Sequence, residues 1–371
     1  MSGARPYAIT MWDFSWLERR WPGAGYEDWD RALGELKERG YDAVRIDAYP
    51  HLMTAGPEQT WHLPPCWTQM SWGAQSPIDL RVGPELVEFM GKAATAGIKV
   101  ALSSWYRKDS RNMRLRIRTP EDQARAWIDT LRYLDAAGVA DNIIYLDLCN
   151  EFPQLNWAPY LYGRLGGAEL SRSSPRIENW MREAIRLVKE AYPNLPCTYS
   201  FASQLTDWRS QDASMLDLLE NHIWMASPEV SEFNRVVGYE FDWFQPDSFD
   251  ALARNGKAEY LSRQDYYDGR LFWRIDENAE WSRVSGKPLV TTECWSIIDY
   301  KDWPGLDWDW VMDINARAVE YVADKGRWIG IATSNFCGPQ FVGMWRDISW
   351  HRRLTDIIHS GRLDDDLIGA A

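Results

Sequence analysis

The sequence predicts a (β/α)8 barrel, and three observations support this fold class. Short apolar runs alternate with longer amphipathic stretches, most of which end at a glycine or a proline. The number of apolar runs is eight, and a helical stretch follows the last one. A length of 371 residues also fits one elaborated α/β barrel. Alternating strands and helices imply parallel strands with right-handed crossovers, and eight such units close on themselves.

The predicted strands are 8–12, 42–48, 98–104, 143–151, 197–203, 221–225, 288–293 and 328–335. The predicted helices are 28–39, 84–96, 121–137, 176–192, 213–219, 264–284, 308–325 and 348–360. Glycines such as Gly97 and Gly138 follow several of these helices, as expected for a left-handed C-terminal cap. The alternative is an open doubly wound sheet, but no Gly-x-Gly-x-x-Gly motif follows a strand.

No linker rich in Pro, Gly or Ser interrupts the chain, so we expect one barrel domain over residues 1–361. Residues 362–371 form an acidic tail that we expect to be flexible. Two insertions are long, 50–82 after the second strand and 227–262 after the sixth. Loops of this length in a compact domain are usually functional, and both belong to the face where barrels carry out chemistry.

Composition narrows the range of partners. The net charge of −13 argues against nucleic acids and anionic membrane surfaces, which both require basic patches. Tryptophan is unusually frequent, with 23 residues, and several fall in predicted loops. The tryptophans in predicted loops or at the end of the first predicted strand are Trp12, Trp16, Trp21, Trp61, Trp67 and Trp72. Aromatic rings stack on the apolar faces of sugars, which favours a carbohydrate ligand, although core packing is the alternative for any single ring.

The cysteines and the N-terminus predict a cytoplasmic protein. Five cysteines occur singly, without close pairs, which favours reduced thiols. The first residues contain no apolar signal core, and no apolar run approaches the length that spans a membrane.

Two glutamates are placed for catalysis. The central apolar strand ends in Asn150-Glu151, and the strand that begins at Pro288 ends in Glu293. The carboxyl ends of parallel barrel strands meet at one face, so the fourth and seventh strands can bring Glu151 and Glu293 across the mouth from each other. Cleavage of a glycosidic bond needs two carboxyl groups in this relation. A helix cap or an arginine partner is the alternative role for either glutamate alone.

These residues resemble the catalytic pair of the retaining glycoside hydrolases of clan A, and the chain is most similar to cellulase-like members around family five. The resemblance implies that Glu293 is the nucleophile and Glu151 the general acid/base. Arg45 matches the arginine that keeps the nucleophile ionised, and Asn150 matches the asparagine that binds the sugar 2-hydroxyl. His222 matches the histidine of the sixth strand.

The chain departs from this pattern at three strands. Trp224 stands where the family commonly has a tyrosine two residues after its strand-six histidine. The third strand offers Ser103-Ser104-Trp105-Tyr106 instead of a histidine, and Asn335-Phe336 replaces the tryptophan expected after the eighth strand. The departures affect the expected substrate more than the expected reaction, and we count Trp224 and Asn335 among the substrate-binding candidates.

Further candidates are acidic and aromatic. Asp47 lies on the same side of its strand as Arg45, so it either binds a sugar hydroxyl or pairs with that arginine. Trp12 either lines a sugar pocket or packs in the core. Asp147 is expected to be a satisfied carboxylate inside the barrel. No histidine spacing typical of a metal site is present, and we predict neither a metal nor a cofactor.

The sequence therefore predicts a retaining β-glycosidase acting on a short oligosaccharide or glycoside. Exo-action is expected because the long insertions can close a cleft into a pocket. Two alternatives are a transglycosylase with the same glutamates and a carbohydrate-binding barrel without activity. The sugar and the oligomeric state are not predicted.

Overall fold

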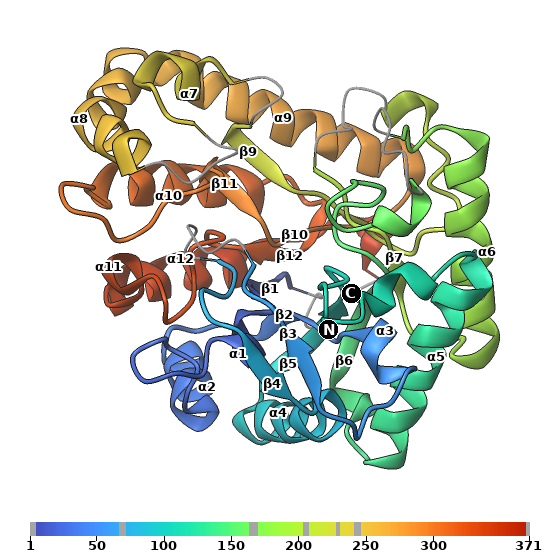
Figure 1. Cartoon of the computed structure of the whole chain (residues 1–371). Helices are drawn as coiled ribbons and strands as arrows, with labels where there is room; N and C mark the ends of the chain where they lie inside the picture. Colours follow the sequence, from blue (N-terminus) through green and yellow to red (C-terminus); the bar gives the residue numbers. More distant parts are fainter. Residues whose placement is uncertain are drawn as a thin grey trace.

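The computed structural model describes residues 5–66, 72–162, 170–202, 208–227, 231–240 and 246–368. Within these residues, eight parallel strands form a barrel that helices surround, which confirms the predicted fold class (Figure 1). The strands are β1 (Tyr7–Asp13), β2 (Ala43–Asp47), β5 (Lys99–Ser103), β6 (Ile143–Asp147), β7 (Cys197–Thr198), β8 (Leu219–Glu220), β10 (Leu289–Thr291) and β12 (Trp328–Ala332). Their order is β7-β6-β5-β2-β1-β12-β10-β8. The ring closes where the Phe201 amide donates to the carbonyl of Glu220 at 3.1 Å.

The main helices form where the amphipathic spacing predicts them. They are α2 (Trp29–Glu38), α4 (Val82–Ala96), α5 (Pro120–Ala136), α6 (Pro175–Ala191), α9 (Gln264–Ser285), α10 (Asp309–Ala323) and α12 (Ile348–Ser360). Side chains of Asp28 and Thr119 cap α2 and α5 by accepting from backbone amides of the first turn. Gly97 and Gly286 end α4 and α9 with φ values of +70° and +67°, a conformation that glycine adopts without strain.

The helix predicted at 213–219 is absent. Asp217 instead bonds to β7, because its amide donates to the carbonyl of Cys197 at 3.0 Å and its carboxylate accepts from the Cys197 amide at 2.8 Å. Leu216 and Leu218 are buried in the turns and bends that lead into β8. Contacts with the neighbouring strand thus override the local helical pattern.

The sixth and seventh strands are each interrupted and then resume. Beyond β8 the chain forms β9 (Ile223–Ala226), and beyond β10 it forms β11 (Cys294–Ile297). These two continuations pair in parallel and lie side by side in Figure 1. The barrel strand therefore starts at Leu219, two residues before the predicted start, and His222 and Glu293 lie in the interruptions. The Ile223 amide donates to the carbonyl of Glu293 at 3.1 Å, which ties the two interruptions together.

Both long insertions contain regular structure. The first holds α3 (Pro50–Met53) and an antiparallel hairpin of β3 (Trp61–Leu63) and β4 (Ile78–Leu80). The second was expected to be a loop but is largely helical, with α7 (Glu232–Val237) and α8 (Pro246–Ser262). Trp67 of the first insertion and residues 241–245 of the second, with Phe241, Trp243 and Phe244, lie outside the described residues. Short helices α1 (Ser15–Glu18) and α11 (Val342–Trp345) follow β1 and β12.

The described part of the C-terminal segment, residues 362–368, packs against the barrel. Leu363 and Leu367 are buried in an apolar cluster with barrel residues that include Ile9 and Val290. Arg327, also buried, lies 2.7 Å from a carboxylate oxygen of Asp366. The segment up to Ile368 is thus folded against the barrel, because its two leucines supply apolar surface that water would otherwise contact.

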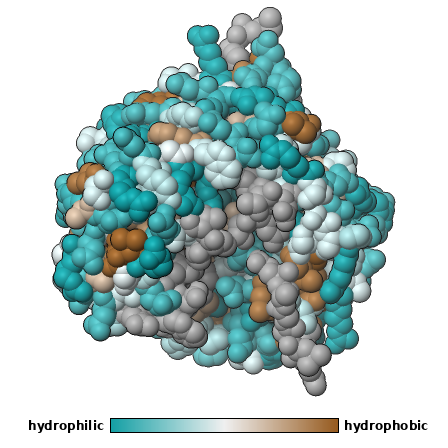
Figure 2. Space-filling view, turned by 90° about the horizontal axis from the view of Figure 1, so that it is seen from above, coloured by the Kyte–Doolittle hydropathy of each residue, from teal (hydrophilic) through white to brown (hydrophobic). Residues whose placement is uncertain are grey.

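On the face that Figure 2 shows, the surface of the described residues is mostly hydrophilic, with scattered hydrophobic residues. Among the described helices, none has the length and apolar character needed to cross a bilayer. The five cysteines are all unpaired.

Candidate active site

Arg45 of β2 is the central cation of the site. It is completely buried, and its Nη2 donates to Asp147 Oδ2 and Asn150 Oδ1, both at 2.6 Å. Its Nη1 donates to Glu293 Oε1 at 3.2 Å, and its Nε lies 3.3 Å from Glu220 Oε1. Burial alone would lower the pKa of Arg45, but the charges of Glu220 and Asp147 outweigh it and raise the pKa. The guanidinium therefore remains charged inside the barrel.

Glu293 occupies the interruption between β10 and β11. Its side chain is nearly buried, with 8% of its surface exposed. Burial raises the pKa of Glu293 to about 7, and the charge of Glu151 adds to this increase. His222 and Arg45 act in the opposite direction by stabilising the ionised carboxylate. Glu293 is thus a carboxylate whose ionisation depends on two neighbouring cations.

Glu151 follows β6 at a sharp turn of the backbone. Its φ of +45° is uncommon for a residue other than glycine, and such conformations often occur at functional sites. The Ser200 hydroxyl accepts from the Glu151 amide at 2.9 Å and holds this turn. One carboxylate oxygen lies 2.8 Å from His222 Nδ1, and the other accepts from Trp157 Nε1 at 3.1 Å. The turn thereby directs Glu151 toward the centre of the barrel mouth.

His222 lies between the two glutamates. Its Nδ1 is 2.8 Å from Glu151 and 3.5 Å from Glu293. Burial would lower the pKa of His222, but Glu293 and the hydrogen bond to Glu151 raise it above its ordinary value. One donor atom from each of the three residues lies within 4.8 Å of the others. Two carboxylates and an imidazole can also hold a divalent cation, but the Arg45 guanidinium beside Glu293 disfavours one.

Asp147 is a satisfied carboxylate inside the barrel, as predicted. It accepts from Arg45 and from the Ser103 hydroxyl at 2.6 Å each, and from the Ser200 amide and hydroxyl at 2.8 Å each. The bonds to Ser103 and Ser200 hold Asp147 in place, and Asp147 in turn holds the guanidinium of Arg45.

Glu220 is part of the cluster although the sequence interpretation did not include it. It is completely buried in β8, accepts from the Thr292 hydroxyl, and lies 4.0 Å from His222 Nε2. Burial raises the pKa of Glu220. A signal was available, because Glu220 lies two residues before His222 and shares its face if the strand is extended to include both. Trp157 was also missed, since nothing in its local pattern points to Glu151.

Three predicted substrate-binding residues do not contact the glutamates. Asp47 does not pair with Arg45, because its carboxylate accepts from the amides of Tyr49 at 2.7 Å and Trp105 at 3.0 Å. Trp12 is completely buried, and its Nε1 donates to the carbonyl of Cys337 at 3.1 Å. Asn335 is completely buried as well, and its backbone amide donates to the backbone carbonyl of Cys294 at 2.9 Å. The hydrogen bonds of Asp47, Trp12 and Asn335 therefore join the barrel strands to the loops that follow them.

An aromatic cluster lies near the interrupted strands. Trp72, from the insertion after β2, stacks on Phe336 with ring centroids 5.9 Å apart and planes 11° apart. Its ring is also 6.2 Å from that of Trp224 in β9. The insertion therefore reaches past the end of β1 to contact residues that follow β12 and β8. Tyr239 of the other insertion donates its hydroxyl to Asp299 at 2.6 Å and is nearly buried, so it holds the insertion in place.

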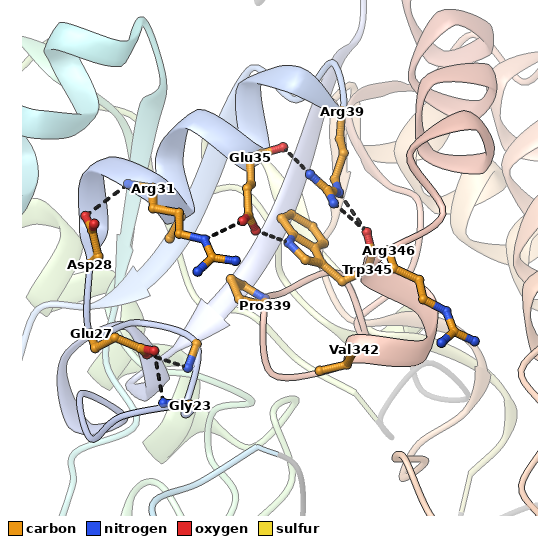
Figure 3. Close-up of a pocket in the computed structure, with 12 residues that line it drawn as sticks. Gly23, Glu27, Asp28, Arg31, Glu35, Arg39, Pro339, Val342, Trp345 and Arg346 are labelled. Carbon is orange, nitrogen blue, oxygen red and sulfur yellow. Dashed lines mark hydrogen bonds and ion pairs between the residues drawn. The ribbon is translucent and has the colours of Figure 1, made fainter.

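A cavity of about 580 Å³ lies on the outside of the barrel, between α2 and α11 (Figure 3). Its lining mixes acids with arginines that pair with them, such as Arg31 and Glu35 at 2.8 Å. The Arg39 side chain donates to the carbonyl of Trp345 and lies over its ring. These contacts join α2 to α11. The lining holds three acids and three arginines, so the cavity has no net formal charge.

Comparisons with known proteins identify the family and the fold of the chain. The profile of a family described as sugar-binding cellulase-like matches residues 9–359. A protein of Parabacteroides distasonis ATCC 8503, provisionally named a glycoside hydrolase, is 46% identical with a TM-score of 0.95, over 98% of this chain and 96% of that one. No protein with a curated description matches the sequence.

Two more distant structures share the fold. A family 5 subfamily 18 glycoside hydrolase from Streptomyces cattleya, in complex with Manβ1-4GlcNAc, is 11% identical with a TM-score of 0.52, over 93% of this chain and 80% of that one. An endo-β-1,4-mannanase from Thermotoga petrophila is 13% identical with a TM-score of 0.55, over 97% of this chain and 78% of that one.

Proposed function

Because the chain belongs to the cellulase-like family, we propose that it is a retaining β-glycosidase with Glu293 as nucleophile and Glu151 as general acid/base. The separation of the two carboxylates carries the proposal. An oxygen of Glu151 lies within 4.8 Å of an oxygen of Glu293. Retaining enzymes hold their carboxyl groups about 5–5.5 Å apart, whereas inverting enzymes need about 6.5–9.5 Å to admit a water molecule. Carboxylate oxygens this close leave little room for a water molecule between the two groups, which supports double displacement.

The surroundings of Glu293 suit a nucleophile. Arg45 at 3.2 Å and His222 at 3.5 Å stabilise the ionised carboxylate before attack. Attack on the anomeric carbon forms a glycosyl ester and removes this charge from a nearly buried position. Because burying a carboxylate charge is unfavourable, burial favours the ester relative to the free carboxylate.

The surroundings of Glu151 suit the residue that transfers the proton. Trp157 and His222 hold one oxygen each, so the carboxyl group keeps a fixed direction toward the bond being cleaved. In the first step Glu151 donates a proton to the leaving oxygen, and in the second it takes one from the attacking water. Loss of the Glu293 charge in the ester removes one of the contributions that raise the pKa of His222. The cluster therefore binds protons less tightly when Glu151 must act as a base.

Asn150 is positioned to bind the sugar. Its amide oxygen accepts from Arg45 at 2.6 Å, which fixes the orientation of the side chain. Within the described chain no residue accepts from its Nδ2, so these N–H groups can donate to a sugar hydroxyl. A hydrogen bond to the 2-hydroxyl strengthens in the transition state.

We also propose exo-action on a short β-linked oligosaccharide or glycoside. Trp72 contacts Phe336 and Trp224 from the opposite side of β1, so the first insertion closes one end of the barrel mouth. A cleft closed at one end accepts the terminus of a substrate more readily than the middle of a polymer.

Hydrolysis of aryl β-glycosides of several sugars, with purified protein, tests the function. Turnover with a β-configured first product, observed by NMR, is the expected result. Glu151→Ala should lower the rate by about 10²–10⁴-fold for substrates that need protonation, but spare dinitrophenyl glycosides. Azide should rescue this variant and give a β-glycosyl azide. An α-glycosyl azide from Glu293→Ala is also consistent with its role as nucleophile, whereas the same product from Glu151→Ala would exchange the two roles. An α-configured first product from the unmodified protein would exclude retention.

A further inference from the structure

The segment between β5 and α5 is strongly basic in a chain whose net charge is −13. Residues 107–118 contain one acid, Asp109, and six cations, which are Arg107, Lys108, Arg111, Arg114, Arg116 and Arg118. The segment follows a barrel strand on the face that carries Glu151 and Glu293. Its charge therefore acts on whatever enters the barrel mouth.

Part of this segment lines a cavity of about 200 Å³. Arg107, Lys108 and Arg114 contribute cations to its wall, and Trp105 and Trp157 contribute rings. Its described lining contains no carboxylate. The cavity is smaller than the range of about 300–1,000 Å³ typical of drug-sized ligands, so it suits one substituent or ring.

Two of the wall residues also contact the catalytic cluster. Trp157 donates to Glu151 Oε2 at 3.1 Å, and the ring of Trp105 lies 4.6 Å from the guanidinium of Arg45. The cavity is therefore next to the carboxylates on the side of Glu151. The general acid protonates the leaving oxygen, so this is the side where the leaving group lies.

The cations of the cavity are unequally neutralised. Arg107 forms two hydrogen bonds to the buried Glu18, at 2.9 and 2.6 Å, and is fully paired. Arg114 donates only to uncharged oxygens, those of Asn112 at 3.1 Å and Tyr106 at 3.2 Å. Lys108 is exposed and has no acidic partner among the described residues.

Asp109 does not neutralise these two cations by direct contact. Its carboxylate accepts from the backbone amides of Arg111 at 2.8 Å and Met113 at 2.6 Å, which shapes the loop. Burial lowers the pKa of Arg114, and the charge of Arg107 lowers it further. An anion in the cavity would stabilise the charged form of Arg114 and supply the partner that the protein lacks.

We propose, on the basis of the glycosidase function above, that this cavity is a leaving-group subsite for an anionic substituent. Lys108 and Arg114 bind the oxyanion, while Trp105 and Trp157 contact the ring that carries it. The shared chemistry is a carboxylate or a sulfonate-like oxyanion on the group that departs. The substrate class is thus an acidic glycoside and not a neutral oligosaccharide.

The test compares 4-carboxyphenyl, 4-sulfophenyl and 4-carbamoylphenyl β-glycosides in each glycone of the screen. The ratio of kcat/KM for a charged substrate to that for the carbamoyl substrate should fall roughly threefold in Lys108→Gln and roughly tenfold in Arg114→Gln. Comparing this ratio between variants cancels the intrinsic difference in leaving ability. The carboxyphenyl and sulfophenyl arms show which oxyanion the subsite prefers.

Arg116→Gln is the matched control, because it removes the same charge from the same segment. Arg116 lines a different cavity, with His51 and Arg125, so its ratio should match that of the unmodified protein. An equal fall in all three variants would mean that the charge of the loop acts at long range, and would overturn the subsite.

The experiments distinguish a wrong proposal of the subsite from a wrong proposal of the glycosidase function. Turnover of the carbamoyl glycoside, with ratios that no variant changes, would overturn the subsite but leave the glycosidase intact. If no glycoside is turned over, the function fails, and binding still tests the cavity. Tryptophan fluorescence with Glu293→Gln should then show tighter binding of the carboxyphenyl than of the carbamoyl glycoside, and Lys108→Gln should remove the difference. Equal binding of both glycosides would overturn the proposal.

Discussion

At the residue scale, Arg45 and Glu293 determine the pH range of activity. The kcat/KM profile should be bell-shaped, because Glu293 must be ionised and Glu151 protonated in the free protein. Burial raises the pKa of Glu293 to about 7, and Arg45 lowers it from what burial alone would give. Arg45→Met should therefore move the acid limb to higher pH, and Arg45→Lys should move it less. An acid limb unchanged in the folded Met variant would remove Arg45 from the ionisation of the nucleophile.

Glu293 should also make stability depend on pH. Its pKa in the folded protein, about 7, is above its ordinary value of 4.5, so the folded state binds the proton more tightly than the unfolded state. The resulting stabilisation is present below pH 4.5 and is lost as pH rises through 7. Glu293→Gln removes this loss, and should raise the free energy of unfolding at pH 8 by an amount on the order of 1–3 kcal/mol. Its Tm should therefore be higher than that of the unmodified protein at pH 8 but not at pH 5. Thermal melting at both pH values measures it. A Tm that falls at pH 8 would contradict the argument.

At the element scale, the insertion that carries Trp72 should contribute to substrate binding. Trp72→Ala removes the ring that stacks on Phe336, and should lower kcat/KM by roughly tenfold or less if the cluster borders the sugar. Trp273 of α9, which is 54% exposed, provides a matched control in Trp273→Ala. A lower Tm for Trp72→Ala with unchanged kinetics would mean that the cluster only joins the insertion to the barrel.

The elements also show how far the sequence alone leads. The eight units were predictable because apolar periodicity and terminal glycines are local signals, and the two glutamates were found because each closes such a run. The sixth strand is predicted to begin at residue 221, so Glu220 falls just before it and is absent from the predicted site, although its spacing of two residues from His222 is a signal once the strand is extended. The partners of Asp47, the amides of Tyr49 and Trp105, could not be predicted because only the folded loops bring them together. The aromatic insertion after β9 is predicted as a loop because its apolar spacing is weak, whereas its described residues include the helices α7 and α8.

At the scale of the whole molecule, the C-terminal segment closes the end of the barrel opposite the glutamates. Leu367 is 1% exposed and packs in the cluster that contains Ile9 and Val290, near the starts of the strands. Barrel chemistry occurs at the carboxyl ends of the strands, so this cluster should affect stability and not activity.

Leu367→Ala should therefore destabilise the protein by about 2–4 kcal/mol, because it removes a buried side chain and leaves a cavity. Ile368 is the matched control, since it is adjacent, apolar and 47% exposed, and Ile368→Ala should change stability by about 0.5 kcal/mol or less. Urea unfolding of both variants measures the difference, and kcat/KM at a temperature where both are folded should be unchanged. If Leu367→Ala is as stable as Ile368→Ala, the segment lies on the barrel without closing it. If the kcat/KM of Leu367→Ala falls while the fold is intact, the end of the barrel that the C-terminal segment closes is coupled to the glutamates at the opposite end.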